Sequence, residues 1–324
     1  MASAVQTAKP ITKPKPKSGR DLGATLHEMW KHRLDYLFIS PFYILFAIFG
    51  IYPLAFGIAL SFSKWQPGRA MTFIGFNNYV NLLSPTTGDP ILVSALVNTI
   101  AMLLWILPTG LGGGLILAVM LNARKLVGRS FFRTVFFLPF VTSQVIVSLV
   151  FQSLLDKDYG WVNLLIGMVG LGPVPWLTET IPAQISITLL LHWMGIGTNI
   201  LIFLGALQSI DRELYEAAEI DGASATQQFF RITFPMIRPV MLFMIVTATI
   251  GLMNLYAPVR LLTNGGPGGT TTTLFMRMID LLTSLRYGEG AGFGFIIGMI
   301  IILITVVQMR FLNNWWTVEG KLKG

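Results

Sequence analysis

Charged residues are missing from six long stretches of the chain. Six windows of at least 20 residues contain no Asp, Glu, Lys or Arg: 36–63, 90–123, 134–155, 180–210, 239–259 and 290–309. A helix of about 20 apolar residues crosses a hydrocarbon core roughly 30 Å thick. Because that core offers no water, each crossing segment must satisfy its own backbone groups, as a helix does. The pattern predicts six membrane-spanning helices, near residues 37–62, 97–121, 134–155, 184–207, 240–259 and 291–312.

A seventh uncharged window, residues 159–178, differs in composition. Its glycines and prolines are Gly160, Gly167, Gly170, Gly172, Pro173 and Pro175. So many Gly and Pro residues disfavour a continuous helix. We therefore expect a loop there, with a short surface helix around Trp161–Met168.

The basic residues fix an orientation for six spans. With the N-terminus inside, the inner segments hold 17 of the 23 Lys and Arg residues and the outer segments hold 6. Cytoplasmic loops carry such an excess of basic residues. We expect a cytoplasmic tail at 1–35, a transmembrane domain at 36–315 and a second cytoplasmic tail at 316–324. The first apolar run is too long for a signal peptide and lacks a small-residue cleavage site.

Composition agrees with a polytopic membrane protein. Hydrophobic residues make up 53% of the 324 residues, charged residues only 12%, and the net charge is +8. A soluble domain carries about 25% charged residues. These values exclude a disordered chain, a collagen-like chain and an ordinary soluble enzyme. The positive charge lies on the inner side, so it indicates membrane orientation rather than nucleic-acid binding.

The predicted spans lack the groups that would energise transport. Apart from Arg310 at the inner end of the last span, His192 is their sole Asp, Glu, His, Lys or Arg residue. A proton- or sodium-coupled transporter would be expected to carry intramembrane acids or Arg. The phosphate-binding pattern G-x-x-x-x-G-K-[ST] is absent, and no catalytic triad or metal-ligand cluster is visible. Any driving energy must therefore enter from outside the chain.

The longest inner loop, residues 208–238, carries the strongest local signals. Asp211 can cap a helix that reaches about Ile220, and Gly222 suits the left-handed residue after a helix end. Ser224 and Gln227 have the spacing of a capping box, which starts a second helix. That helix is expected to end near Pro235 and Pro239, followed by the next span. The loop thus predicts two short helices that meet at an angle.

Three interpretations of this loop are open from the residues alone. The first helix carries five acids and one Arg, which disfavours a DNA-binding helix-turn-helix because acids repel phosphate. An inert connection is the second interpretation. The third is a docking element for a partner protein, in which small residues allow close approach. That surface would comprise Glu216, Ala217, Ala218, Asp221, Gly222 and Ala223.

The spacing of these residues resembles the EAA loop of ABC importer permeases. The family pattern E-A-A-x-x-D-G-A, followed by I-x-L-P, matches here except that Phe234 replaces Leu. Other segments are similar to the maltose-type sugar branch: Phe73–Tyr79, Arg129–Arg133, Phe137–Pro139 and Leu262–Pro267. The resemblance covers about residues 35–315. It implies an all-α, type I importer permease of six helices with cytoplasmic termini, in a bacterial inner membrane.

The resemblance also implies partners. A second, related permease would complete the pore, and two ATPase subunits would hold ATP and Mg, so this chain would need no cofactor of its own. A solute-binding protein would deliver an oligosaccharide from outside. Glu216, Ala217, Ala218, Asp221, Gly222 and Ala223 would form the coupling helix that contacts an ATPase. The chain itself would catalyse no reaction.

Polar residues on the fourth and fifth spans are candidates for the solute pathway. They are His192, Trp193, Gly195, Thr198, Asn199, Asn254 and Tyr256. An aromatic face with an amide suits a sugar ring and its hydroxyls. His192 can equally be a neutral histidine bonded to a neighbouring helix. Ala248, Leu252 and Leu255 are apolar where the family is polar. Either the partner permease holds more of the solute, or the solute differs from maltose.

Other assignments remain open at this stage. The outer loop Leu262–Gly269 is either a simple turn or a docking site for the binding protein. The solute is a neutral or acidic oligosaccharide, or a compound of the glycerol-phosphate type. A membrane scaffold or receptor that signals through the inner loop is the alternative outside transport.

Overall fold

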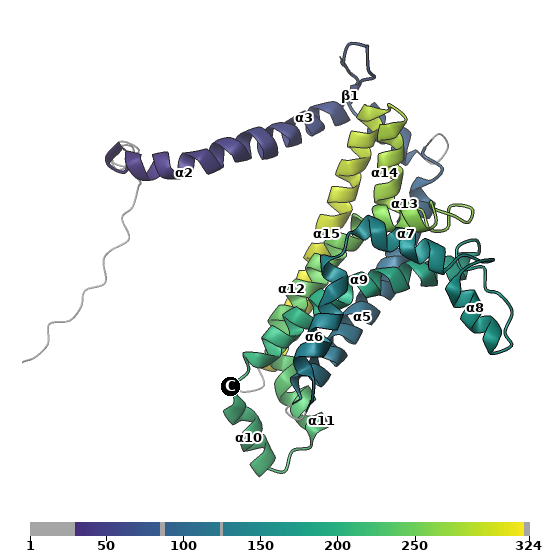
Figure 1. Ribbon diagram of the computed structural model, residues 1–324. Coiled ribbons are helices and arrows are strands. Elements are labelled where there is room, and N and C mark those ends of the chain that lie inside the picture. The colour runs from purple at the N-terminus through teal and green to yellow at the C-terminus, as the bar shows by residue number, and fades with distance from the viewer. Residues whose placement is uncertain (1–29, 85–87, 124–125, 321–324) are drawn as a thin grey trace, which may run out of the picture. The chain divides into compact units, whose positions relative to one another are not determined.

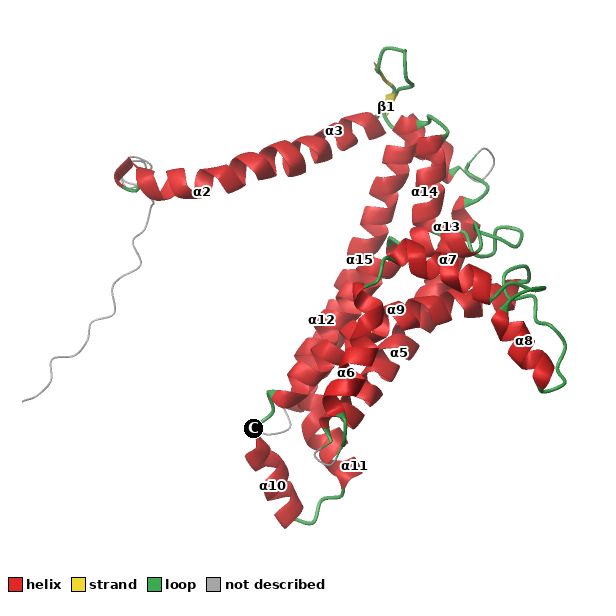
Figure 2. Cartoon of the chain, in the orientation of Figure 1, coloured by secondary structure: helices red, strands yellow, loops and turns green. Residues whose placement is uncertain are grey.

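The computed structural model describes residues 30–84, 88–123 and 126–320, with side chains as far as residue 311. Most of the tail predicted over 1–35, and residues 321–324 of the second tail, lie outside the described residues. Helix predominates throughout (Figure 2). The chain divides into two units, residues 1–57 and 58–324.

The first unit is a helical run. α2 (Arg33–Phe46) continues through a π-helical turn (Ala47–Ile51) into α3 (Tyr52–Ser61), whose last residues belong to the second unit. Pro53 has no N–H to offer the carbonyl four residues earlier, within the π turn. The run has 29 residues and contains an 18-residue window with a mean hydropathy of 2.1. It is the first predicted span.

Four long helices of the second unit lie side by side (Figure 1). They are α5 (Leu92–Asn122), α9 (Thr180–Gln208), α12 (Phe234–Met253) and α15 (Tyr287–Gly320). Together with the run in the first unit, this makes five helical segments among the described residues that are long and apolar enough to cross a membrane. A bent helix pair adds a sixth if it forms one span. The all-α, multi-span class is thus confirmed.

Close backbone approach joins α9 to two neighbours. A Cβ at Gly114 of α5 would stand 2.5 Å from the Cβ of Asn199, and one at Gly197 would stand 2.4 Å from the Phe136 carbonyl oxygen. Both distances are shorter than real contacts of a Cβ, so only glycine fits. In lipid, where apolar burial drives little association, such small residues let helices pack. α9 is therefore held closely on both sides.

The third span is not the continuous helix predicted near 134–155. α6 (Arg129–Phe137) passes into a 3-10 turn (Leu138–Val141), and α7 (Gln144–Leu154) departs at 99°. Pro139 lies in the 3-10 turn and fixes its own backbone angle there. Thr142 and Ser143 then adopt extended conformations. The absence of charge predicted an apolar segment correctly, but it carried no information about the break.

The seventh window forms the loop and short helix that we expected. α8 is Trp161–Met168. Asn163 of this helix is buried, and its side-chain amide donates to the carbonyls of Lys157 and Val174 at 3.0 and 2.9 Å. Its Oδ1 accepts from the Val174 amide and the Trp176 indole. One amide side chain thus joins the segments before and after α8.

The prolines after the inner loop do not end a helix. α11 (Ala225–Gln228), a π-helical turn (Phe229–Thr233, η3) and α12 form one run without a break. Pro235 lies in the first turn of α12, directly after the π turn, and has no N–H to donate. Pro239 lies inside α12. The prediction of a separate second helix was wrong, because the π turn carries the helix past Pro235.

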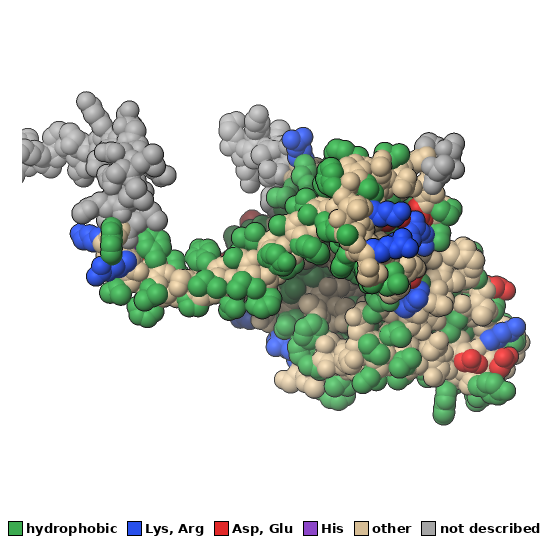
Figure 3. Space-filling view, turned by 90° about the horizontal axis from the view of Figure 1, so that it is seen from above, with side chains coloured by type: hydrophobic (Ala, Val, Ile, Leu, Met, Phe, Trp, Pro, Cys, Tyr) green, Lys and Arg blue, Asp and Glu red, His purple; other side chains and the backbone are tan. Residues whose placement is uncertain are grey.

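The end of the second unit opposite the inner loop is built from short elements. They are a two-residue antiparallel hairpin of β1 (Ser63–Lys64) and β2 (Thr72–Phe73), α4 (Asn77–Leu83), α13 (Ala257–Leu262) and α14 (Leu274–Thr283). α12 ends at Met253, short of the predicted Val259. Figure 3 views the molecule from this end, where Lys and Arg side chains gather beside acidic ones.

Candidate functional site

α10 (Arg212–Ile220) is the first arm of the inner loop. The Asp211 side chain accepts a hydrogen bond from the Glu213 amide at 3.1 Å. Such a cap satisfies an unpaired N–H at the helix start and contributes about 1 kcal/mol. A negative charge there also interacts favourably with the helix dipole. The predicted start of this helix is confirmed.

The arm ends at a left-handed glycine. Gly222 has φ +75°. Its amide donates to the Glu219 carbonyl at 3.1 Å, and the Ala223 amide donates to the Ala218 carbonyl at 2.9 Å. These two bonds form the Schellman arrangement, which occupies carbonyls that the helix leaves unpaired. The predicted role of Gly222 as a helix end is confirmed.

The second arm begins three residues later. The Gln227 amide donates to the Ser224 hydroxyl at 3.3 Å, and the Ser224 amide donates to Gln227 Oε1 at 2.8 Å. This is the reciprocal capping box expected from the sequence. We call residues 211–224, from the Asp211 cap to the Ser224 cap, the elbow. Local hydrogen bonds fix it at both of its ends.

The elbow presents its small and acidic residues at the surface. No residue of α10 is buried, and a Cβ at Gly222 would meet nothing within 4 Å. Glu216, Ala217, Asp221 and Gly222 are exposed, while Ala218 and Ala223 are half-buried. Ile220 is also exposed, at 88%. The elbow is therefore an exposed projection in which acidic side chains surround small residues.

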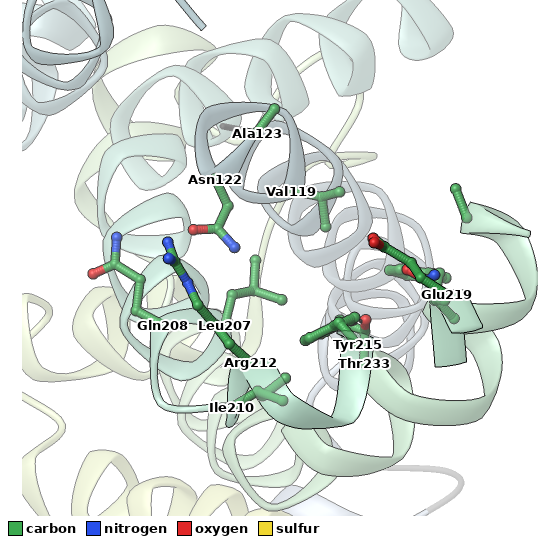
Figure 4. A pocket seen from close by; sticks show the side chains of 13 residues that line it. Val119, Asn122, Ala123, Leu207, Gln208, Ile210, Arg212, Tyr215, Glu219 and Thr233 are labelled. Atoms are coloured by element: carbon green, nitrogen blue, oxygen red, sulfur yellow. Dashed lines mark hydrogen bonds between the residues drawn. The ribbon is translucent and has the colours of Figure 1, made fainter. Parts of the chain in front are cut away.

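One hydrogen bond ties the first arm to the following helix. The Tyr215 hydroxyl lies 2.8 Å from Thr233 Oγ1 in η3. Both residues line a cavity of about 460 Å³, shown in Figure 4, which also takes in Arg212 and Glu219 from α10 and Asn122 from the end of α5. α10 therefore lies beside the helix bundle, and this cavity separates part of it from the bundle.

A second cavity, of about 280 Å³, lies between α5, α7, α9 and α12. His192 lines it, with Nε2 2.9 Å from Thr109 Oγ1 and Nδ1 2.8 Å from the Thr188 carbonyl oxygen. Both ring nitrogens thus have partners, one of them on the neighbouring helix α5. This agrees with the interpretation of His192 as a histidine bonded between helices.

Three of the candidate solute residues meet in this cavity. They are His192, Gly195 and Asn199. The Asn199 amide donates to the Gly110 carbonyl at 3.1 Å. Gln144, the first residue of α7, also lines the cavity, and sequence reasoning missed it. The cause is the bend before α7, because a continuous span gave no reason to place Gln144 beside α9.

The other four candidates lie elsewhere. Trp193 is 53% exposed, and Thr198 is half-buried outside the cavity lining. The Asn254 amide donates to the Ile250 carbonyl at 2.7 Å within its own helix turn. Tyr256 packs beside Phe275, with ring centroids 6.4 Å apart. The structure does not bring these four to one site with His192.

Within the described residues, no group of three or more His, Asp or Glu side chains could hold a metal ion. The site thus combines an exposed, acidic elbow at one end with a cavity between long helices, whose polar side chains are those of Gln144, His192 and Asn199.

Residues 110–315 match the family described as "Binding-protein-dependent transport system inner membrane component". The chain belongs to this family. The matched residues include both the elbow and the cavity helices α9 and α12. As a permease of this family, the chain is a multi-pass protein of the bacterial inner membrane.

Curated relatives extend the match to almost the whole permease. The "Lactose transport system permease protein LacF" of Rhizobium radiobacter is 36% identical over 291 residues, which cover 88% of this chain and 94% of the relative. The "Arabinooligosaccharides transport system permease protein AraP" of Bacillus subtilis (strain 168) is 30% identical over 313 residues, 95% of this chain and 96% of the relative.

A solved structure shares the fold of the permease. One chain of "bacterial alginate ABC transporter in complex with alginate pentasaccharide-bound periplasmic protein" has a TM-score of 0.76 and 24% identity. The match covers 88% of this chain and 95% of that chain. The type I importer permease architecture expected from the sequence is therefore confirmed.

Proposed function

We propose that this permease forms half of the translocation pore of an ATP-driven importer for an oligosaccharide. A second, related permease would supply the other half, two ATPase subunits would dock beneath, and a solute-binding protein would deliver the solute outside. Both termini would lie in the cytoplasm, on the side of α10. Family membership and the names of the relatives support this assembly.

The elbow is the observation that carries the coupling role. A partner that pushes on α10 needs a rigid contact, and local caps hold α10 at both ends. The exposed set Glu216, Ala217, Ala218, Asp221, Gly222 and Ala223 would enter a groove of the ATPase. Ser209 to Asp211 alone separate α9 from α10, so movement of the elbow would pass directly to α9. Closure of the ATPase pair would then rock the bundle as a rigid body between inward and outward states.

The test of coupling uses the complete importer in proteoliposomes. Glu216→Lys reverses a charge at the proposed contact, and Gly222→Asp adds a charged side chain to the exposed small-residue surface there. We expect both variants to insert normally, to lose uptake and to lose stimulation of ATP hydrolysis by the loaded binding protein. Asp158→Lys, an equal charge reversal in an exposed loop after α7, should leave both rates unchanged. Normal uptake by both elbow variants would exclude the coupling role.

The cavity beside His192 supports a neutral solute. Its polar groups are an amide at Gln144, an amide at Asn199 and the imidazole, and no Lys, Arg, Asp or Glu lines it. Amides and a histidine can hydrogen-bond sugar hydroxyls, whereas a phosphate or a uronic acid calls for a cation. This favours a neutral oligosaccharide over an acidic one or a glycerol-phosphate compound.

A matched pair of substitutions tests the cavity. Gln144→Leu removes an amide that lines it, and Asn254→Leu removes an amide that bonds within its own helix turn. We expect the first to raise the KM for oligosaccharide uptake about tenfold, because a solute hydroxyl would lose its partner. The second should not change KM. Equal effects would rule out the cavity as the solute path.

Co-purification separates transport from the scaffold alternative. Affinity capture of this permease should bring down a second permease and two copies of an ATP-hydrolysing subunit. Recovery of the chain without any ATPase would contradict the importer.

A further inference from the structure

An apolar groove runs between α6 and the second half of α9. It has a volume of about 380 Å³, shares the lining residue Gln208 with the cavity at the elbow, and shares none with the cavity beside His192. Most of its lining is aromatic, aliphatic or glycine, namely Phe136, Phe137, Gly197, Ile200, Leu204 and Gly205. Such a lining excludes a sugar or a polar peptide and suits a hydrocarbon chain.

The groove has an apolar end and a polar end. At the apolar end, Gly197 meets the backbone of Phe136. At the other end lie Gln208, the last residue of α9, and Arg133 of α6. The 11 residues from Gly197 to Gln208 rise about 16 Å, which is comparable to the length of a fatty acyl chain. The polar end is the one from which α9 leads into α10.

Arg133 is a cation without a partner. Its Nε is buried, and among the described residues it has no hydrogen bond or ion pair. Arg129, one turn earlier, also has a buried Nε without a partner, but its Nη2 donates to the Ala123 carbonyl. A buried donor that is left unpaired is costly. An anionic group at this end of the groove would satisfy it.

α6 also has the surface of a helix that lies at a membrane interface. Phe131, Phe132 and Val135 of α6, and Leu138 directly after it, are exposed although they are large and apolar. The basic residues 129 and 133 lie one helical turn apart on the same helix. Aromatic residues with Arg on one helix are typical of segments that sit at the level of lipid headgroups.

We propose that the groove binds one anionic phospholipid from the leaflet next to α10. Its phosphate accepts hydrogen bonds from the Arg133 guanidinium, and one acyl chain lies along α9 toward Gly197. Charge complementarity selects this occupant, because the groove offers a lone cation above an apolar channel. The bound lipid would sit three residues before the elbow begins, so membrane composition would act on the helix that connects the elbow to the bundle. The proposal does not depend on the solute or on the ATPase.

Native mass spectrometry of the full chain, purified in detergent with its copurifying subunits, tests the proposal. The probes are phosphatidylglycerol and phosphatidylcholine with identical acyl chains. One basic residue near a lipid surface corresponds to about a fivefold preference for an anionic headgroup. We expect that preference in the native chain and its loss in Arg133→Gln. Arg310→Gln removes an equal charge from an exposed position on α15 and should keep it.

A second variant fills the channel and leaves the cation in place. Gly205 has open space where a side chain would stand, so Gly205→Leu should lower retention of both lipids severalfold. Gly112→Leu, which also enters open space but on α5, should not. Equal behaviour of Arg133→Gln and Arg310→Gln would overturn the headgroup site, and unchanged lipid retention in Gly205→Leu would overturn the channel. If Gly205→Leu instead released a second permease with its lipids unchanged, the groove would belong to that protein.

Discussion

The two ends of the second unit are built by opposite means. At the elbow, the cap at Asp211, the bonds around Gly222 and the capping box at Ser224 all join residues within five positions of one another. At the α13–α14 end, the shaping bonds join distant segments. Asn98 of α5 donates to the carbonyls of Gly269 and Thr272, at 2.8 and 3.1 Å.

Burial separates the two ends as well. The Leu274 amide donates to the buried Thr99 hydroxyl at 3.0 Å, across 175 positions of sequence. Arg277 binds Asp89 through two nitrogens, at 2.6 and 3.0 Å to Oδ2, and the Asp89 side chain is only 3% exposed. At the elbow, the bond between Tyr215 and Thr233 is only partly buried. The elbow is therefore an exposed projection that local bonds hold in shape. The α13–α14 end is instead bonded to the helix bundle.

The difference shows how the molecule divides its tasks. A projection held by local bonds keeps its shape while the helix that carries it moves. Segments that are tied to α5 by buried bonds must move with α5. Damage at the two ends should consequently differ in kind: loss of global stability at the α14 end, and loss of local order at the elbow.

The largest effect is expected at the buried ion pair. Arg277→Leu leaves the Asp89 carboxylate buried and unpaired, which should cost about 3–5 kcal/mol in the free energy of unfolding. Arg260→Leu breaks the exposed pair with Asp280, 3.1 Å apart, and should cost less than about 1 kcal/mol. Thermal or denaturant unfolding of the purified permease measures both. A similar cost for the two variants would show that burial of the Arg277–Asp89 pair does not hold the α14 segment to the bundle.

The second largest effect is expected from substitutions of Gly222. Gly222→Val forces a branched side chain into a left-handed conformation, at a cost of about 1–2 kcal/mol to the elbow. Gly222→Asn should be nearly neutral, because asparagine tolerates this conformation. Hydrogen exchange of the amides in residues 212–223 should accelerate in the valine variant, while the global unfolding midpoint stays constant. A large shift of that midpoint would mean that the elbow is part of the global fold.

The capping box should have a smaller effect. Ser224→Ala removes the side chain that accepts the Gln227 amide, which should cost about 1 kcal/mol. Ser209→Ala removes a hydroxyl that bonds back to the Ala206 carbonyl in the preceding turn and should cost little. Limited proteolysis at Arg231 compares the two variants. Equal cleavage rates would show that the capping box does not hold the second arm.

The smallest effect concerns the turn after α7. Asp156 accepts hydrogen bonds from the Tyr159 and Asp158 amides, both at 2.9 Å, and these bonds lower the pKa of its carboxyl, the Tyr159 bond most. The stability that this contributes is present above the ordinary carboxyl pKa and is lost as pH falls through the lowered pKa. Asp156→Ala should accelerate trypsin cleavage at Lys157 slightly at neutral pH. Asp158→Ala serves as the control, and identical rates would contradict the role of Asp156.

The same distinction between local and distant bonds explains what the sequence predicts. The helix start at Asp211, the helix end at Gly222 and the capping box at Ser224 depend on neighbours in sequence and follow from residue order. The bend before Gln144 and the bonds from Asn98 and Thr99 to the α14 segment depend on packing across the bundle. No local pattern carries that information, which is why Gln144 was missed and Asn254 was assigned to a site that it does not line.

The π turn Phe229–Thr233 bears on how chain length can vary. A π turn bonds each residue to the fifth along rather than the fourth, so it holds one residue more than an ordinary turn. A deletion inside a regular helix rotates everything beyond it by about 100°. A deletion inside this turn would instead convert it to an ordinary one, and the face of α12 that lines the His192 cavity would keep its direction. A one-residue gap here is therefore a change that the transmembrane helix can absorb.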